Sequence, residues 1–253
     1  MKGGEGVPRL FLRDEEMFSL ARRLTGCRDA IDTFLKLVKW PVGICALLVL
    51  PAAVKTFERY YVIRNQLNWH NLIYFAIGVG FFAAVRVAFL MRRGAAETLE
   101  HEMTHTLFAM LTLHSVHDMK VNEGGGGSMS FSGQGNWMIA LAPYFFPLAA
   151  FGMMFFSTLV VRIAGFTPDW VYIGLGVAVG YNLFSFAEQL HPRQTDFKAA
   201  GYLFTICFLP AANCLSFGTV FAFVERGGKG VAFFYRLIAY YTKQDWAAVL
   251  NWF

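Results

Sequence analysis

Long apolar segments separated by short polar stretches dominate the pattern along the chain. An α-helix needs about 20 apolar residues to cross the hydrocarbon core of a bilayer. Five segments approach or exceed that length and predict membrane helices near residues 37–54, 71–90, 137–164, 170–187 and 201–224. A further segment, near 95–116, is polar in its first half and apolar in its second. It raises the expected number of helices at membrane depth to six.

The segment near 95–116 differs from the others because it carries five ionisable side chains, Glu97, Glu100, His101, Glu102 and His105. Ionisable groups are costly at membrane depth, so their presence indicates a functional site. Arg86, near the end of the preceding segment, can instead extend its charge to the membrane surface and needs no special function.

Two short stretches of alternating character, Met119–Asn122 and Ser128–Ser132, flank a glycine turn at residues 124–127. This pattern predicts a β-hairpin, with a flexible glycine linker as the alternative. The expected fold is an all-α multi-pass membrane protein with about six membrane helices. The small β-hairpin would lie between helices three and four.

The distribution of charge predicts a cytoplasmic N-terminal arm (1–36), a membrane core (37–224) and an amphipathic C-terminal tail (225–253) on the membrane surface. With six crossings, 15 of the 22 lysines and arginines fall on the side of the N-terminus. Basic residues favour the cytoplasmic side, so both termini are expected there. In this arrangement the polar stretch 188–198 lies on the opposite side.

The composition agrees with a bilayer as the solvent. Hydrophobic residues make up 56% of the chain and charged residues 15%, against about 25% charged in soluble domains. The net charge of +5 comes with no basic block interleaved with aromatics and no nucleic-acid motif. We therefore expect the lipid bilayer, and no nucleic acid, as a partner.

The sequence His101-Glu102-Met103-Thr104-His105 predicts metal chemistry. On a helix, His101 and His105 share one face, so their imidazoles can bind one zinc ion. Zinc lowers the pKa of a bound water toward 7, and Glu102, about 100° around the helix, is placed to take its proton. The pattern predicts zinc-assisted hydrolysis with Glu102 as general base.

A catalytic zinc site needs a third protein ligand and leaves the fourth position to water. At 100° per residue, His114 and His117 point toward the opposite face of the helix and are poor candidates. The polar stretch 188–198 offers Asp196, which we prefer, and His191. The alternative role of Asp196 is to cap the next helix, and that of His191 is a loop residue.

The HExxH sequence, the glycine-rich hairpin and the small-residue sequence ending at Pro143 resemble the site-2 protease family of intramembrane zinc metalloproteases. The similarity is closest to the compact bacterial branch and covers about residues 71–200. In that family a later helix carries Asn, then Pro, then an Asp-Gly pair that supplies the third zinc ligand. Here Ser185 stands in place of the proline after Asn182, and no glycine follows Asp196.

The resemblance implies one zinc ion held by His101, His105 and Asp196, with Asn182 steadying the substrate or the oxyanion. The alternative role of Asn182 is a hydrogen bond that packs one helix on another. It also implies that the hairpin binds an extended substrate by strand addition. The residues expected to do so are Val121, Asn122, Met129 and Phe131.

The expected function is intramembrane zinc endopeptidase, acting on a membrane-anchored protein and residing in the bacterial cytoplasmic membrane. One alternative is a non-catalytic membrane scaffold or transport component with a structural or vestigial metal site. Another is a membrane di-iron oxidase, which needs more histidines than the six present. The sequence identifies neither the substrate nor a regulatory partner.

Overall fold

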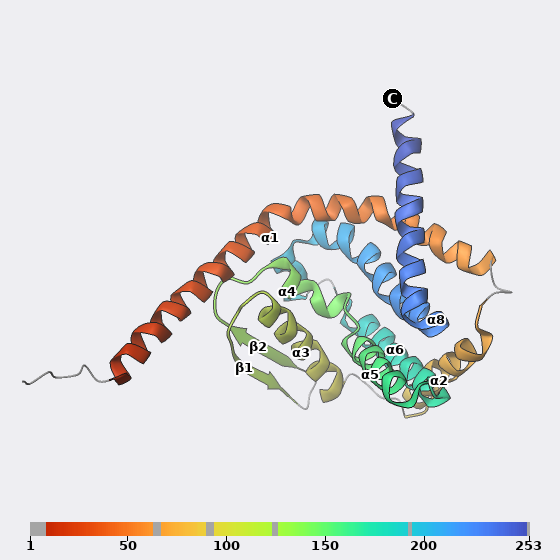
Figure 1. The fold of residues 1–253 in the computed structure, drawn as a ribbon, viewed down its shortest axis with the longest axis horizontal. Helices are drawn as coiled ribbons and strands as arrows, with labels where there is room; N and C mark the ends of the chain where they lie inside the picture. The colour runs from red at the N-terminus through yellow and green to blue at the C-terminus, as the bar shows by residue number, and fades with distance from the viewer. Residues whose placement is uncertain (1–8, 63–66, 90–93, 123–125, 192–193, 252–253) are drawn as a thin grey trace, which may run out of the picture.

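A computed structural model describes residues 9–62, 67–89, 94–122, 126–191 and 194–251 (Figure 1). The described chain is mostly helical and contains one two-stranded sheet. In chain order the elements are α1 (Arg9–Val62), α2 (Trp69–Ala88), α3 (Ala95–Leu111), β1 (Val116–Val121), β2 (Gly127–Phe131), α4 (Trp137–Leu141), the 3-10 helix η2 (Ala142–Tyr144), α5 (Leu148–Ala164), α6 (Asp169–Gln189), α7 (Thr195–Ala200) and α8 (Tyr202–Leu250).

From Arg9 onward, the N-terminal arm and the first apolar segment form one continuous helix, α1, with no break at residue 36. Figure 1 shows the arm extending beyond the rest of the bundle. The apolar half of α1 packs along α8, where Ala53 and Tyr60 are buried against Phe234 and Ile238.

Helices α2 and α6 approach each other closely because glycines face the opposite backbone. A Cβ on Gly78 would lie 2.1 Å from the carbonyl oxygen of Ile173, and one on Gly176 would lie 2.0 Å from that of Phe75. Small residues let membrane helices pack backbone to backbone. This pair forms the support for α3.

The predicted β-hairpin is confirmed between α3 and α4, with β1 and β2 antiparallel and Met119 opposite Met129. Part of the predicted glycine turn, residues 123–125, lies outside the described residues. A Cβ on Gly127 would lie 2.5 Å from Cγ2 of Thr98 and 2.6 Å from Oε1 of Glu102. Only a glycine therefore lets the hairpin pack this closely on the helix that carries the HExxH sequence.

Four described helices are long and apolar enough to cross a membrane, namely Arg22–Tyr60 within α1, α2, α6 and Tyr202–Ala248 within α8. A fifth span is present if α4–η2 and α5, which are bent by 78° relative to each other, count as one. These helices are compatible with a multi-pass membrane protein. Six spans were expected, and α3 is not among the candidates because its first half is polar.

Helix α8 breaks at Arg226 and Gly227, whose backbone angles are not helical. Beyond the break the chain turns back, since a Cβ on Gly218 would lie 2.3 Å from the ring of Phe234. Phe234 is fully buried. The first part of the predicted C-terminal tail is therefore a helix packed on the preceding span and on α1.

Hydrogen bonds between helices identify the two ends of the bundle. At one end Nδ2 of Asn71 donates to the carbonyl oxygen of Val224 at 2.9 Å. At the other, Arg86 lies 2.6 Å from Glu188, and the polar stretch after Glu188 places Asp196 beside His101. The polar stretch and the HExxH sequence therefore lie at the same end of the bundle.

Arg86 was expected to extend its charge toward the membrane surface. It is instead buried inside the protein, with 5% of its side chain exposed. Its guanidinium forms ion pairs with Glu97 of α3 and Glu188 of α6. One side chain of α2 thus fixes the start of α3, the helix with the HExxH sequence, against α6.

We expect Arg86→Met to lower the thermal unfolding temperature of the purified protein, because two carboxylates lose their cation. Removing one partner of a buried ion pair costs about 3–5 kcal/mol. Arg86→Lys should recover part of the loss, since an ammonium keeps the charge but not the planar fork. An unchanged unfolding temperature for Arg86→Met would show that these ion pairs do not hold α3.

Candidate metal centre

Three side chains from two helices converge on one point. His101 and His105 lie on α3 with their Nε2 atoms 3.0 Å apart. Oδ2 of Asp196, on α7, lies 3.5 Å from the first and 3.6 Å from the second. Ligands about 2.0–2.1 Å from a tetrahedral zinc ion lie roughly 3.3–3.4 Å from one another. The three separations bracket that value, so the geometry fits a single small cation.

Hydrogen bonds on the far side of each imidazole fix its tautomer. Nδ1 of His105 lies 2.8 Å from the carbonyl oxygen of Ile139, and Nδ1 of His101 contacts Oε1 of Gln189. The amide nitrogen of Gln189 donates to Ser185, which fixes the orientation of that amide. Carbonyl oxygens only accept, so each Nδ1 carries a proton, which leaves each Nε2 able to give its lone pair to a metal ion. Without a metal ion, a protonated Nε2 can donate to the Asp196 carboxylate instead.

Asp196 is held as a carboxylate. Burial by itself raises its pKa, but His101, His105 and a hydrogen bond from the Tyr144 hydroxyl at 2.8 Å outweigh burial and hold that pKa well below its usual range. The adjacent Phe197 is buried against Tyr144, with ring centroids 4.5 Å apart, and anchors the short helix α7. The N-cap of α7 is Gln194, so Asp196 does not act as the cap.

The other candidate ligands lie elsewhere. Across the described ranges, the only group of His, Cys, Asp and Glu atoms close enough to share an ion is His101, His105 and Asp196. His191 is exposed at the end of α6 and is not part of it. His114 is buried, but its Nε2 faces Asp32 at 3.1 Å. The preference for Asp196 over His191 thus agrees with the geometry.

A cavity of about 1120 Å³ opens in front of the three ligand residues. Glu102 lines this cavity and is itself only 6% exposed. Met129 and Phe131 of β2 also line it, whereas Val121 and Asn122, at the end of β1, do not. Of the two strands, β2 therefore faces the candidate metal centre.

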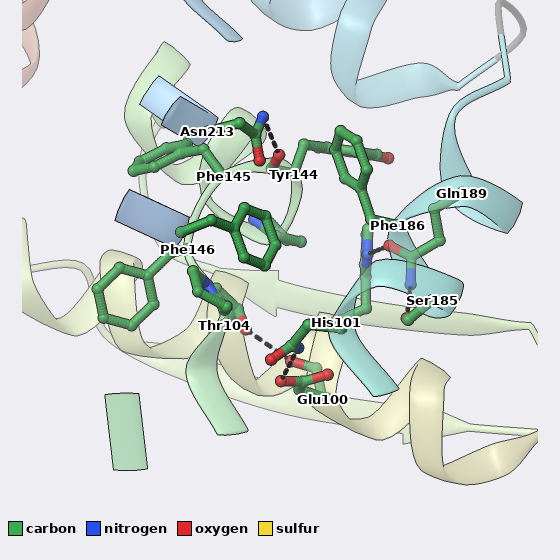
Figure 2. Close-up of a pocket in the computed structure, with 14 residues that line it drawn as sticks. Glu100, His101, Thr104, Tyr144, Phe145, Phe146, Ser185, Phe186, Gln189 and Asn213 are labelled. Atoms are coloured by element: carbon green, nitrogen blue, oxygen red, sulfur yellow. Dashed lines mark hydrogen bonds between the residues drawn. The ribbon is translucent and has the colours of Figure 1, made fainter. Parts of the chain in front are cut away.

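His101 also borders a second, small pocket between α3, α6, α8 and the chain that follows α4 (Figure 2), and Asn182 is one of the residues that line it. Its amide nitrogen donates to Glu100 at 2.8 Å, and the same carboxylate oxygen accepts the backbone N–H of Ala149, at the start of α5, at 2.9 Å. Asn182 does not line the large cavity. The structure gives it a contact that holds α3 against α6, and a role toward the substrate stays a prediction.

The supporting residues Tyr144 and Gln189 were not singled out by sequence reasoning. Figure 2 shows Gln189 reaching toward His101 from α6. Its partner is 88 positions away in the chain, and the partner of the Tyr144 hydroxyl is 52 positions away. No local pattern marks such pairs, because they form only when the helices are assembled.

Comparison of the chain with protein-family models, curated proteins and solved structures finds no match. The case for a metal centre therefore depends on its donor set. Two neutral imidazoles and one carboxylate suit zinc, and the described residues bring no fourth His, Cys, Asp or Glu to the group. Such a three-ligand set leaves one coordination position for water or substrate.

Proposed function

We propose that the chain is an intramembrane zinc endopeptidase that hydrolyses a peptide bond in or near the transmembrane segment of a membrane-anchored protein. The observation that carries the proposal is the convergence of His101, His105 and Asp196 at one wall of a cavity that Glu102 also lines. The resemblance to the site-2 proteases points to the same chemistry.

Glu102 moves the proton in this proposal. A bound zinc ion would acidify a water molecule and polarise the scissile carbonyl. The Glu102 carboxylate takes the proton as the water attacks and later delivers it to the leaving amine. His101 and His105 keep their Nε2 lone pairs directed inward through their bonds to Gln189 and Ile139.

Strand β2 orients the substrate. The described sheet has two strands, so β2 has one edge without a strand partner, and Ser128, Met129 and Phe131 line the cavity. A transmembrane helix has its carbonyls engaged in internal hydrogen bonds and resists attack. Strand addition would hold a locally unwound segment extended and present its scissile carbonyl to the site.

Two alternatives are less well supported. A structural site normally has four protein ligands, and the described residues supply three while Glu102 lines the same cavity without joining the group. A di-iron site needs further carboxylates or histidines around a second ion. The described chain contains one group of three such residues.

Removal of the metal tests the proposal. We expect the purified chain in lipid vesicles to cleave a single-span model protein, and a chelator to abolish this cleavage. One equivalent of zinc should restore it, because the three ligands act only in the metal-bound form. Cleavage should be followed by mass spectrometry, with the metal content of each sample measured by elemental analysis. Undiminished cleavage by a metal-free sample would rule out the proposed chemistry.

A further inference from the structure

One face of the N-terminal part of α1 forms a wall of the large cavity. Its residues recur with helical spacing and are all polar or charged: Arg28, Asp29, Asp32, Thr33, Lys36 and Lys39. The apolar sequence of a transmembrane segment would leave this wall without partners. A polar stretch of substrate, next to its membrane span, suits it better.

Hydrogen bonds fix this wall to the frame of the candidate metal centre. The indole N–H of Trp137 donates to the carbonyl oxygen of Leu35 at 2.8 Å. The Asp32 carboxylate accepts from Nδ2 of Asn136 at 2.8 Å and contacts Nε2 of His114 at 3.1 Å. The charged side chains of α1 therefore have defined positions relative to β2 and α4.

Some of the charged side chains on this wall have an ion-pair partner, and others do not. Arg28 pairs with Asp29 at 2.6 Å, and Asp32 is engaged as described. Within the described ranges, no carboxylate oxygen lies within 4.0 Å of the Lys36 or Lys39 ammonium. The Lys39 ammonium lies over the face of the Phe204 ring, 5.2 Å from its centroid. Two positive charges on the cavity wall are thus available to a ligand.

Lys39 lies close to the short helix that carries Asp196. Its Nζ would lie 3.5 Å from a Cβ on Gly201, just after the end of α7, while Asp196 lies in the first turn of that helix. The Lys39 ammonium is therefore placed at the end of α7 opposite the candidate ligand.

We infer that the cavity selects substrates with acidic side chains close to the scissile bond, held by Lys36 and Lys39. This inference rests on the proposed function and names the class of its substrate, a protein with an acidic juxtamembrane segment. Anionic lipid headgroups share the same chemistry. The two lysines, however, line the cavity that contains Glu102 and Asp196, which favours the peptide.

The test uses the full chain, loaded with zinc, in vesicles of neutral phosphatidylcholine. Three single-span model proteins would differ only in the residues beside the span, which are Glu, Gln or Lys. We expect the Glu protein to be cleaved with the highest kcat/KM. The charge reversals Lys36→Glu and Lys39→Glu together should invert the order, by about fivefold for each ion pair lost. Lys243→Glu, an exposed lysine at the far end of α8, is the matched control and should leave the order unchanged.

The outcomes separate this inference from the proposed function. Glu102-dependent cleavage of all three substrates at equal rates, or an unchanged order in the double variant, overturns the inference and leaves the protease intact. An order that appears only when anionic lipid is added assigns the lysines to headgroups and also overturns it. If no substrate is cleaved in a Glu102-dependent manner, both fail.

Discussion

Replacing Glu102 by Gln should lower the rate of peptide-bond cleavage by about 10²- to 10⁴-fold, the range expected when a positioned general base is lost. Gln has nearly the same shape as Glu but cannot accept the proton. Glu102 is not one of the three converging ligand residues, so the variant should bind zinc as the parent does.

The measurement is kcat on a single-span model protein, with zinc content and thermal unfolding temperature determined on the same preparation. Glu102→Ala serves as a second variant, because it removes the carboxylate without leaving an amide in its place. If either variant cleaves at the parental rate while fully loaded with zinc, Glu102 is not the base. A variant that loses both its zinc and its cleavage activity would instead indicate that Glu102 takes part in metal binding.

Replacing Asp196 by Ala should weaken zinc binding more than a hundredfold. Removal of an outer-shell partner costs about 10–100-fold in metal affinity, and the loss of a direct ligand should exceed this. Asp196 is the only one of the three ligands that comes from outside α3, so the variant leaves a two-histidine site on one helix. Cleavage should fall with zinc occupancy and return in part at high zinc concentration.

Asp29→Asn is the matched control for this variant. Asp29 lines the same cavity and carries the same charge, but it pairs with Arg28. Its replacement should leave the zinc Kd unchanged. Equal zinc affinity for Asp196→Ala and the parent would remove Asp196 from the site, and His191 would then become the next residue to replace.

Local sequence patterns predicted the parts of the structure that depend on nearby residues. The hairpin followed from alternation around a glycine turn, and the shared face of His101 and His105 from the helical period. The candidate spans in α1, α2, α6 and α8 followed from their apolar lengths. In each case the pattern and its structural consequence lie within a few helical turns or strand residues.

The features that sequence analysis missed depend on contacts between distant segments. Arg86 was expected at the surface, since nothing nearby showed that Glu188 would meet it. The predicted boundary between residues 224 and 225 lies beside the break in α8 at Arg226 and Gly227, but the sequence did not show that the following helix packs back on the preceding span. Asp196 was one of two candidates because the separation of 91 positions from His105 carries no periodic signal.

Several of the residues predicted to contact the substrate also lie elsewhere than expected. The resemblance assigned Asn182 to the substrate, but its amide contacts Glu100 behind α3. The strand residues divide as well, since Met129 and Phe131 reach the cavity and Val121 and Asn122 do not. These differences arise from which face of each element is turned toward the site, a property of the assembled bundle.

X-ray absorption at the zinc edge, on the purified Glu102→Gln protein, tests the central claim most directly. The account predicts one zinc ion per chain with two imidazole nitrogens and one carboxylate at about 2.0–2.2 Å, and one further oxygen that exchanges with solvent or an added inhibitor. These ligands should be lost in part when His101, His105 or Asp196 is replaced. A closed shell of four protein ligands, or a chain that binds no stoichiometric zinc, would contradict the account.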